Sequence, residues 1–177
     1  NSIDFKISFV QEKVDEKYYK DKIDYKYEND KILKYKTAIL KVGLDESDRA
    51  SYNSCRTLYI KNKNQEIVTK QYNDVEFKPT NPYNDSAYLA KLYLSEDNIP
   101  RCIKDKSEIS KNSIIEFAYD ELNNEWIPLR SRNDKTKPNY FKIANNVWSS
   151  INNPITDKMI TTGKDIPDID ESEELYW

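Results

Sequence analysis

The sequence predicts an all-β fold, a barrel or a sandwich, followed by one C-terminal helix. Three observations lead to this prediction. Short segments in which apolar and polar residues alternate recur up to residue 132, and this two-residue period is typical of strands buried on one face. Turn-forming residues separate these segments, without the helices that a β-helix-β order would need. The apolar spacing becomes helical only after residue 139.

The first half of the chain contains the first expected strands. Residues 3–10 (IDFKISFV) alternate apolar and polar side chains, and residues 35–44 (YKTAILKVGL) form a second apolar segment that an acidic run follows. Residues 11–31 are highly charged with scattered tyrosines, which fits either a long hairpin or an exposed connection. Residues 55–62 and 65–73 are expected to pair as two more strands with a Lys-Asn turn between them.

The second half continues the strand pattern and adds a hairpin. Residues 75–85 contain two prolines, so we expect a loop or an edge strand, because proline cannot donate a ladder hydrogen bond. Residues 87–94 fit a strand or a helix, and their aromatic content favours the strand. Residues 112–120 and 125–132 flank the turn sequence ELNN and predict a hairpin.

One amphipathic helix is expected after this hairpin. Asn139 is the predicted N-cap, and Asn152-Asn153-Pro154 is expected to end the helix. A short helical turn is expected at residues 156–162, closed by Gly163. We expect Trp126 to pack in the core and Trp148 under the helix. The apolar face is formed by Phe141, Ala144, Val147, Trp148 and Ile151.

The composition excludes several classes of function. The chain has 177 residues, of which 33% are charged, and a mean hydropathy of −0.92, which suits one polar globular domain and no membrane span. It contains no histidine, which excludes His-based acid–base catalysis, Ser-His-Asp triads and most zinc sites. Cys55 and Cys102 lack metal-ligand spacing, and we interpret them as free thiols in a reducing compartment.

Charge is unevenly distributed along the chain. Six acidic residues and one lysine give residues 164–177 a charge of −5, which leaves +2 on residues 1–163 of the total −3. A nearly neutral body does not predict a broad basic nucleic-acid surface. Exposed tyrosines on strands could nevertheless stack single-stranded bases. The candidates are Tyr25, Tyr27, Tyr35, Tyr59 and Tyr72.

Arginine is scarce, and two arginines stand together. Only five of the 28 basic residues are Arg, and the favoured residues have AT-rich codons, so retained arginines suggest sites where lysine will not serve. Arg130 and Arg132 share one face of a strand, and Asp134 and Lys135 follow. Such a group suits the binding of a polyphosphate, because the guanidinium groups and the ammonium can bind phosphate oxygens and the carboxylate can orient a guanidinium. The alternative interpretation is a charged hairpin end exposed to solvent.

The sequence IIEFAYDELNNEWIPLRSRNDKTKPN resembles the last conserved motif of the covalent nucleotidyltransferases, the mRNA guanylyltransferases and ATP-dependent ligases. Arg132, Asp134 and Lys135 match the R-x-D-K motif that closes the last strand of their small OB-fold domain. NSIDFKI resembles the stretch that follows the paired-lysine motif of guanylyltransferases. The "T-K-P-N" segment and the following helix are more similar to capping enzymes of large DNA viruses than to ligases.

This resemblance implies a domain organisation. Residues 1–155 are expected to form a five-stranded Greek-key OB-fold barrel with insertions. Residues 156–177 are expected to be an acidic linker toward a following domain, with a cap guanine methyltransferase as one candidate. The chain does not begin with Met, and we expect it to be part of a longer polypeptide that includes an upstream nucleotidyltransferase domain.

The resemblance also implies roles for individual residues. Arg132 and Lys135 would contact the β- and γ-phosphates of GTP on domain closure, with Asp134 orienting Arg132. Arg130 is either a phosphate contact or the partner of an acidic side chain. Asp4 either fixes the motif across the domain junction or is a surface acid at a strand edge. No residue is expected to bind a metal in this chain.

The family's nucleophilic lysine lies in a K-x-D-G motif, which this sequence lacks, so the chain alone is expected to be inactive and to hold no cofactor. In the intact enzyme, GTP with Mg or Mn and the 5′ end of mRNA are the expected substrates, in viral replication sites of the host cytoplasm and without a membrane. Two alternatives stay open: the OB domain of an ATP-dependent DNA or RNA ligase, and a non-catalytic OB module that binds single-stranded nucleic acid.

Overall fold

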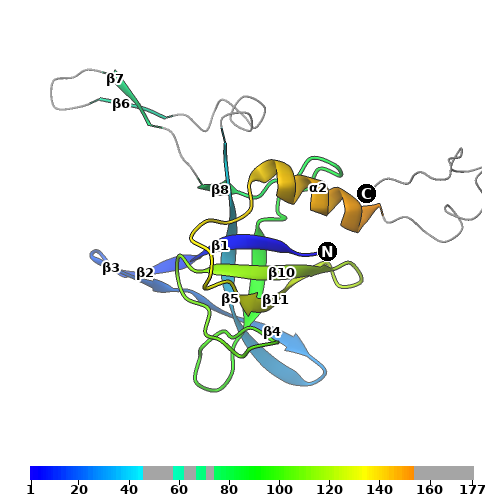
Figure 1. The fold of residues 1–177 in the computed structure, drawn as a ribbon. Helices are drawn as coiled ribbons and strands as arrows, with labels where there is room; N and C mark the ends of the chain where they lie inside the picture. Colours follow the sequence, from blue (N-terminus) through cyan, green and yellow to red (C-terminus); the bar gives the residue numbers. More distant parts are fainter. Residues whose placement is uncertain (46–57, 62–66, 71–73, 154–177) are drawn as a thin grey trace, which may run out of the picture.

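The computed structural model describes residues 1–45, 58–61, 67–70 and 74–153 of the chain. The prediction of a helical turn at 156–162 and of an acidic linker falls outside these residues, as does Cys55. The main sheet curls into a barrel (Figure 1), and five strands form its wall. They are β1 (Ile3–Phe9), β5 (Lys31–Gly43), β9 (Leu89–Tyr93), β10 (Ile114–Asp120) and β11 (Glu125–Ser131).

The strand order is that of an OB-like barrel. β1 pairs with β10 on one side and with β5 on the other, β10 pairs with β11, and β9 pairs with β5, all antiparallel. β9 and β11 come into contact and close the circle, although no ladder joins these two described strands. This is a five-stranded, partly open barrel. The predicted all-β OB-like fold with one C-terminal helix is confirmed.

Hairpins are inserted between the barrel strands. β2 (Gln11–Asp15) pairs with β3 (Tyr18–Asp21), and β4 (Ile23–Glu28) pairs with β5. Of the two interpretations of residues 11–31, the structure therefore agrees with a hairpin rather than an exposed connection. β2 and β3 form one hairpin, and β4 forms a second one with β5. Asn29 and Asp30 join β4 to β5 with φ values of 51° and 61°, which a two-residue hairpin turn requires and which these residue types tolerate.

Further strands lie between β5 and β9. β6 (Leu58–Lys61) and β7 (Ile67–Lys70) form the predicted antiparallel pair, while the Lys-Asn turn between them lies outside the described residues. β8 (Asp74–Glu76) pairs with the end of β5, which agrees with an edge strand before the prolines. β9 confirms the strand interpretation of residues 87–94.

The core combines aliphatic side chains with a cluster of aromatic rings. Phe5 contacts Phe77, Phe117 and Trp126 with ring centroids 5.1 to 5.8 Å apart. Trp148 of α2 (Phe141–Asn152) is 1% exposed and packs on Phe77 and Trp126. Both indoles find acceptors, because Trp126 Nε1 donates to the Ala87 carbonyl and Trp148 Nε1 donates to the Pro82 carbonyl. The expectation of two core tryptophans is confirmed.

The helix begins one residue later than predicted. Tyr140 is the N-cap, with an extended backbone and no side-chain capping bond, so the assignment of Asn139 as N-cap is wrong. The Asn139 side chain is occupied elsewhere, by the backbone of β1. The helix ends at Asn152, as predicted, and Val147 is half-buried beside the core.

Two further findings concern the described residues only. Cys102 is a buried free thiol, as its spacing suggested. No helix in the described part of the chain combines the length and apolar character that crossing a membrane would need.

Candidate functional site

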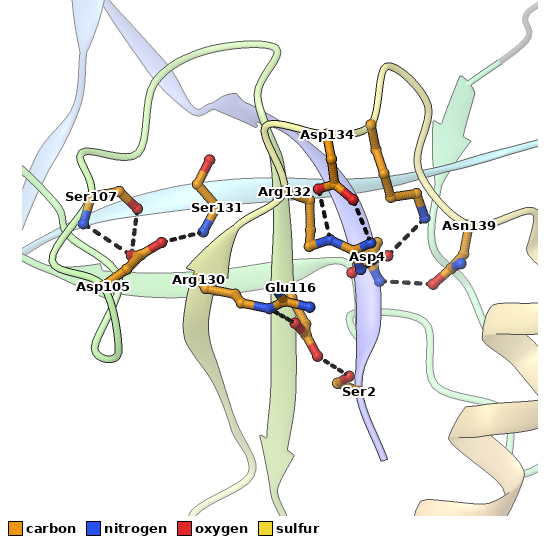
Figure 2. A network of polar contacts seen from close by, with 11 residues as sticks. Ser2, Asp4, Asp105, Ser107, Glu116, Arg130, Ser131, Arg132, Asp134 and Asn139 are labelled. Atoms are coloured by element: carbon orange, nitrogen blue, oxygen red, sulfur yellow. Dashed lines mark hydrogen bonds and ion pairs between the residues drawn. The ribbon is translucent and has the colours of Figure 1, made fainter.

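The residues after β11 form a tight turn on the outer face of the barrel. The Arg132 backbone N–H donates to the Ile114 carbonyl at 2.8 Å and extends the pairing of β11 with β10. The Lys135 N–H then donates to the Arg132 carbonyl at 3.0 Å, which closes a four-residue turn. The turn reverses the chain, so that Arg132 and Lys135 both reach β1 (Figure 2).

Asp4 on β1 lies under this turn. Its Oδ2 accepts a hydrogen bond from Arg132 Nη1 at 3.0 Å and one from Lys135 Nζ at 2.7 Å. Asp4 is only 6% exposed, and among the described residues it is the one charged or polar residue that is buried. Two cations on one oxygen provide the compensation that a buried carboxylate needs. The structure thus brings Asp4, Arg132 and Lys135 together; a role of Asp4 across a domain junction stays a prediction.

Asp134 holds the Arg132 guanidinium from the solvent side. Arg132 Nε donates to Asp134 Oδ1 at 3.1 Å, and Nη2 donates to Oδ2 at 3.0 Å, a two-bond fork that fixes the plane of the group. With the bond to Asp4, three of the five guanidinium N–H groups have acceptors among the described residues, and two have none. The side chain of Arg132 remains 22% exposed, so these two groups are available to a ligand.

Asn139 ties the turn to the barrel. Its Oδ1 accepts from the Asp4 backbone N–H at 2.8 Å, and its own N–H donates to the Asp4 carbonyl at 2.9 Å. The Asn139 carbonyl accepts from the Gly43 N–H of β5 at 2.9 Å. No local sequence pattern predicts this role of Asn139, because the contact joins residues that are 135 positions apart.

Arg130 lies in a row of charges across three strands. Asp4, Glu116 and Arg130 are directly opposite one another on β1, β10 and β11. Arg130 Nε donates to Glu116 Oε1, and the Ser2 hydroxyl donates to Glu116 Oε2. A bulge in the pairing after Glu116 brings Arg130 into this register. Arg130 is thus the partner of an acidic side chain, with half of its own side chain exposed; Ser2 and Glu116 were not predicted.

The loop before β10 covers the outer edge of β11. The Ile103 and Lys104 N–H groups donate to the carbonyls of Pro128 and Leu129. Asp105 accepts from the Ser131 N–H at 3.1 Å, and the Ser107 hydroxyl and N–H hold that carboxylate in place (Figure 2). The edge strand is therefore protected, and the backbone that carries Arg130 and Arg132 is held from both sides.

Hydrogen bonds within the cluster shift the pKa values of Glu116, Arg132 and Asp134 in the directions that favour their charged forms. The guanidinium of Arg132 lowers the pKa of Asp134 to about 2, and the hydrogen bonds to Asp134 raise the pKa of Arg132. The Ser2 hydroxyl, followed by Arg130, lowers the pKa of Glu116. The cluster thus contains three cationic side chains and three carboxylates. The cations are held in fixed positions in which a polyanion could bind them.

The Asp134 carboxylate predicts a dependence of stability on pH. Its pKa in the folded chain is about 2, against an ordinary value of 3.8, so its contribution is present above pH 3.8 and is lost as the pH falls toward 2. We expect Asp134→Asn to flatten the fall in melting temperature over this interval. Asp85→Asn is the control, since this exposed aspartate has no ion pair among the described residues. Identical profiles for the two variants would contradict the prediction.

The described residues offer no obvious metal centre. Nowhere in the described part do three Asp, Glu or Cys side chains gather in a group that could hold an ion.

Two comparisons relate the chain to known proteins. A family model described as "mRNA capping enzyme, C-terminal domain" matches residues 1–161. A protein of Acanthamoeba polyphaga mimivirus, named "Probable mRNA-capping enzyme", is 28% identical over 179 aligned positions that cover 92% of this chain. The chain spans 13% of the length of that relative.

Proposed function

The chain belongs to the family of mRNA capping enzyme C-terminal domains, and we propose that it is the OB-fold portion of an mRNA guanylyltransferase. In the intact enzyme, GTP and diphosphate-ended RNA would give GpppRNA through a lysyl-GMP intermediate. The nucleophilic lysine would lie in another domain, because this chain has no K-x-D-G motif. The chain alone would therefore be inactive.

The observation that carries this proposal is the cluster over Asp4. Arg132 and Lys135 follow the last barrel strand, as the R-x-D-K motif requires, and both are anchored to the same carboxylate. Arg132 keeps two N–H groups without described acceptors, and Asp134 fixes their direction. A rigid fork beside an ammonium is the arrangement that recognises phosphate oxygens.

The proposed mechanism assigns these groups to the leaving pyrophosphate. The lysine amine of the upstream domain attacks the α-phosphorus of GTP, the bond to the β-phosphate oxygen breaks, and pyrophosphate departs. Arg132 and Lys135 hold the β- and γ-phosphates in line with the attacking nitrogen and stabilise the developing charge. Orientation of this kind supplies on the order of 7–11 kcal/mol of a reaction barrier.

Domain closure would bring the cluster to the nucleotide. When the OB domain closes, the phosphates would share Arg132 and Lys135 with the carboxylates that hold them in the structure; when it opens, pyrophosphate leaves and the RNA end enters. Arg130, half exposed beside them, is proposed as a further phosphate contact from its free guanidinium edge. Mg²⁺ or Mn²⁺ would neutralise phosphate charge when bound with GTP.

The partners follow from the same proposal. They are an upstream nucleotidyltransferase domain of the same chain, the 5′ end of mRNA and, as one candidate, a downstream cap guanine methyltransferase. The greater length of the mimivirus relative supports the presence of other domains. The proposed location is a viral replication site in the host cytoplasm.

The test is covalent labelling of the full-length protein with α-labelled nucleotide. We expect an acid-stable protein–GMP adduct from GTP, none from ATP, and transfer of the GMP to diphosphate-ended RNA. Labelling by ATP would identify a ligase instead. The absence of any adduct, together with binding of single-stranded nucleic acid, would leave a non-catalytic OB module.

A further inference from the structure

A second candidate site lies at the other end of β11. A cavity of about 350 Å³ opens between the β4–β5 hairpin, β9 and the β10–β11 turn. Arg132 is seven residue steps along the extended chain from Glu125 at this cavity, a distance of at most about 23 Å. The cavity is lined by Lys26, Leu89, Lys91, Asn124, Glu125 and Trp126, among others.

The outer face of β9 presents a row of three different side chains beside this cavity. Leu89, Lys91 and Tyr93 all point outward and are exposed, with Leu89 39% and Tyr93 36% exposed. Tyr93 is directly opposite Tyr35 on β5, and the two rings meet edge to face with centroids 5.9 Å apart. The row therefore offers an aliphatic surface, a cation and a supported aromatic ring.

The cations are held in place by aromatic rings. Lys91 Nζ lies 5.2 Å from the centroid of Tyr35, and it has no ion pair among the described residues. Lys26 Nζ lies 5.8 Å from the centroid of Tyr93 and forms ion pairs with Glu28 and Glu125. Cation–π contacts position an ammonium without neutralising it. Lys91 thus presents an ammonium without a carboxylate partner, among the described residues, at the rim of the cavity.

The cavity also contains groups that could bond to the edge of a base. The Asn124 amide N–H groups have no acceptor among the described residues, since only its Oδ1 is used, by the Tyr119 hydroxyl. Glu125 Oε2 accepts from the Tyr93 hydroxyl at 2.9 Å, which fixes the carboxylate and the ring together. A donor and an acceptor therefore stand beside the aromatic and aliphatic surfaces.

We propose that this groove, formed by the outer face of β9, the β4–β5 hairpin and the β10–β11 turn, binds single-stranded RNA. Bases stack on Tyr93 and Leu89, Lys91 contacts the phosphates, and Asn124 with Glu125 bonds to base edges. Stacking of this type accepts every base, so any sequence preference of the groove would come from Asn124 and Glu125. The choice of RNA rather than DNA as the ligand rests on the proposed function. The proposal that the groove binds a single-stranded nucleic acid does not depend on that function.

A fixed spacing follows from the path of β11. The strand joins the groove to the turn that carries Arg132, so RNA lying in the groove and a nucleotide held by Arg132 would be separated by at most about 23 Å of rigid strand. The groove would thus hold the body of the transcript a few nucleotides from its 5′ end. Such a contact retains the RNA while its end is exchanged into the active site.

The test measures binding of a short, fluorescent, single-stranded RNA with a 5′-hydroxyl to the full-length protein at several salt concentrations. Lys91→Glu and Tyr93→Ala are each expected to lower the affinity about tenfold, and Lys91→Ala to reduce the salt-dependence slope by about 0.7. Tyr93→Phe keeps the ring and is expected to bind as well as the wild type. Lys142→Glu, on the exposed side of α2, is the control for the change in charge.

The outcomes separate this proposal from the proposed function. Equal losses for Lys91→Glu and Lys142→Glu, or unchanged binding by both Lys91→Glu and Tyr93→Ala, would overturn the RNA groove and point to another class of partner. Lys91→Glu is expected to retain labelling by GTP. Groove-dependent RNA binding by a protein that GTP does not label would overturn the guanylyltransferase proposal alone.

Discussion

Arg132→Lys is expected to lower the rate of protein–GMP formation by the full-length enzyme about 100-fold, the size of effect seen when one preorganised donor to a developing charge is removed. Lysine keeps the positive charge. It loses the two-bond fork to Asp134 and the third bond to Asp4, so the direction of the charge is no longer fixed. The measurement is single-turnover labelling with α-labelled GTP.

The matched control is Arg101→Lys. Arg101 also pairs with an aspartate, Asp97, at 3.1 Å, and it lies on a loop outside the cluster, so its replacement is expected to leave labelling unchanged. Circular dichroism of both variants checks that the fold is retained. If Arg132→Lys labels at the rate of Arg101→Lys, the guanidinium fork does not act on the phosphates.

The barrel strands could be predicted from the sequence because each has a local alternating pattern. The period-2 segments correspond to β1, β5, β9, β10 and β11, and the helical spacing of Phe141, Ala144, Trp148 and Ile151 corresponds to the buried face of α2. The capping of α2 could not be predicted in this way. Asn139 has the right residue type and position for an N-cap. Its side chain instead accepts a hydrogen bond from the backbone of β1, so it does not cap the helix.

The candidate site was only partly predictable for the same reason. Arg132, Asp134 and Lys135 are close in sequence, so their association is local. Asp4 is 128 residues from Arg132, and only the resemblance to a family connected the two. Glu116 could not be predicted as a site residue, because its pairing with Arg130 depends on a bulge that shifts the register of β10 and β11. The spacing of apolar residues does not reveal such a bulge.

Asp4→Asn is expected to reduce the free energy of unfolding by about 3 kcal/mol, the lower end of the cost of removing one partner from a buried ion pair. Asparagine has almost the same shape, and the backbone bonds between Asp4 and Asn139 do not need the carboxylate. The charge is what disappears. Arg132 Nη1 and Lys135 Nζ, which share Asp4 Oδ2, would then face each other without their common anion.

Urea unfolding of the 177-residue chain measures this effect, with Asp74→Asn as the control. Among the described residues, Asp74 makes one ion pair, with Lys6 at 3.4 Å, and its side chain is 31% exposed, so its loss is expected to cost less than about 1 kcal/mol. In the full-length enzyme, Asp4 acts as a positioning residue: Asp4→Asn would lower kcat for GMP transfer more than it raises the KM for GTP, because phosphates still meet two cations but in the wrong orientation. Equal destabilisation by the two variants would mean that Asp4 does not organise the cluster. The proposal that Asp4 positions Arg132 and Lys135 for phosphate binding would then be wrong.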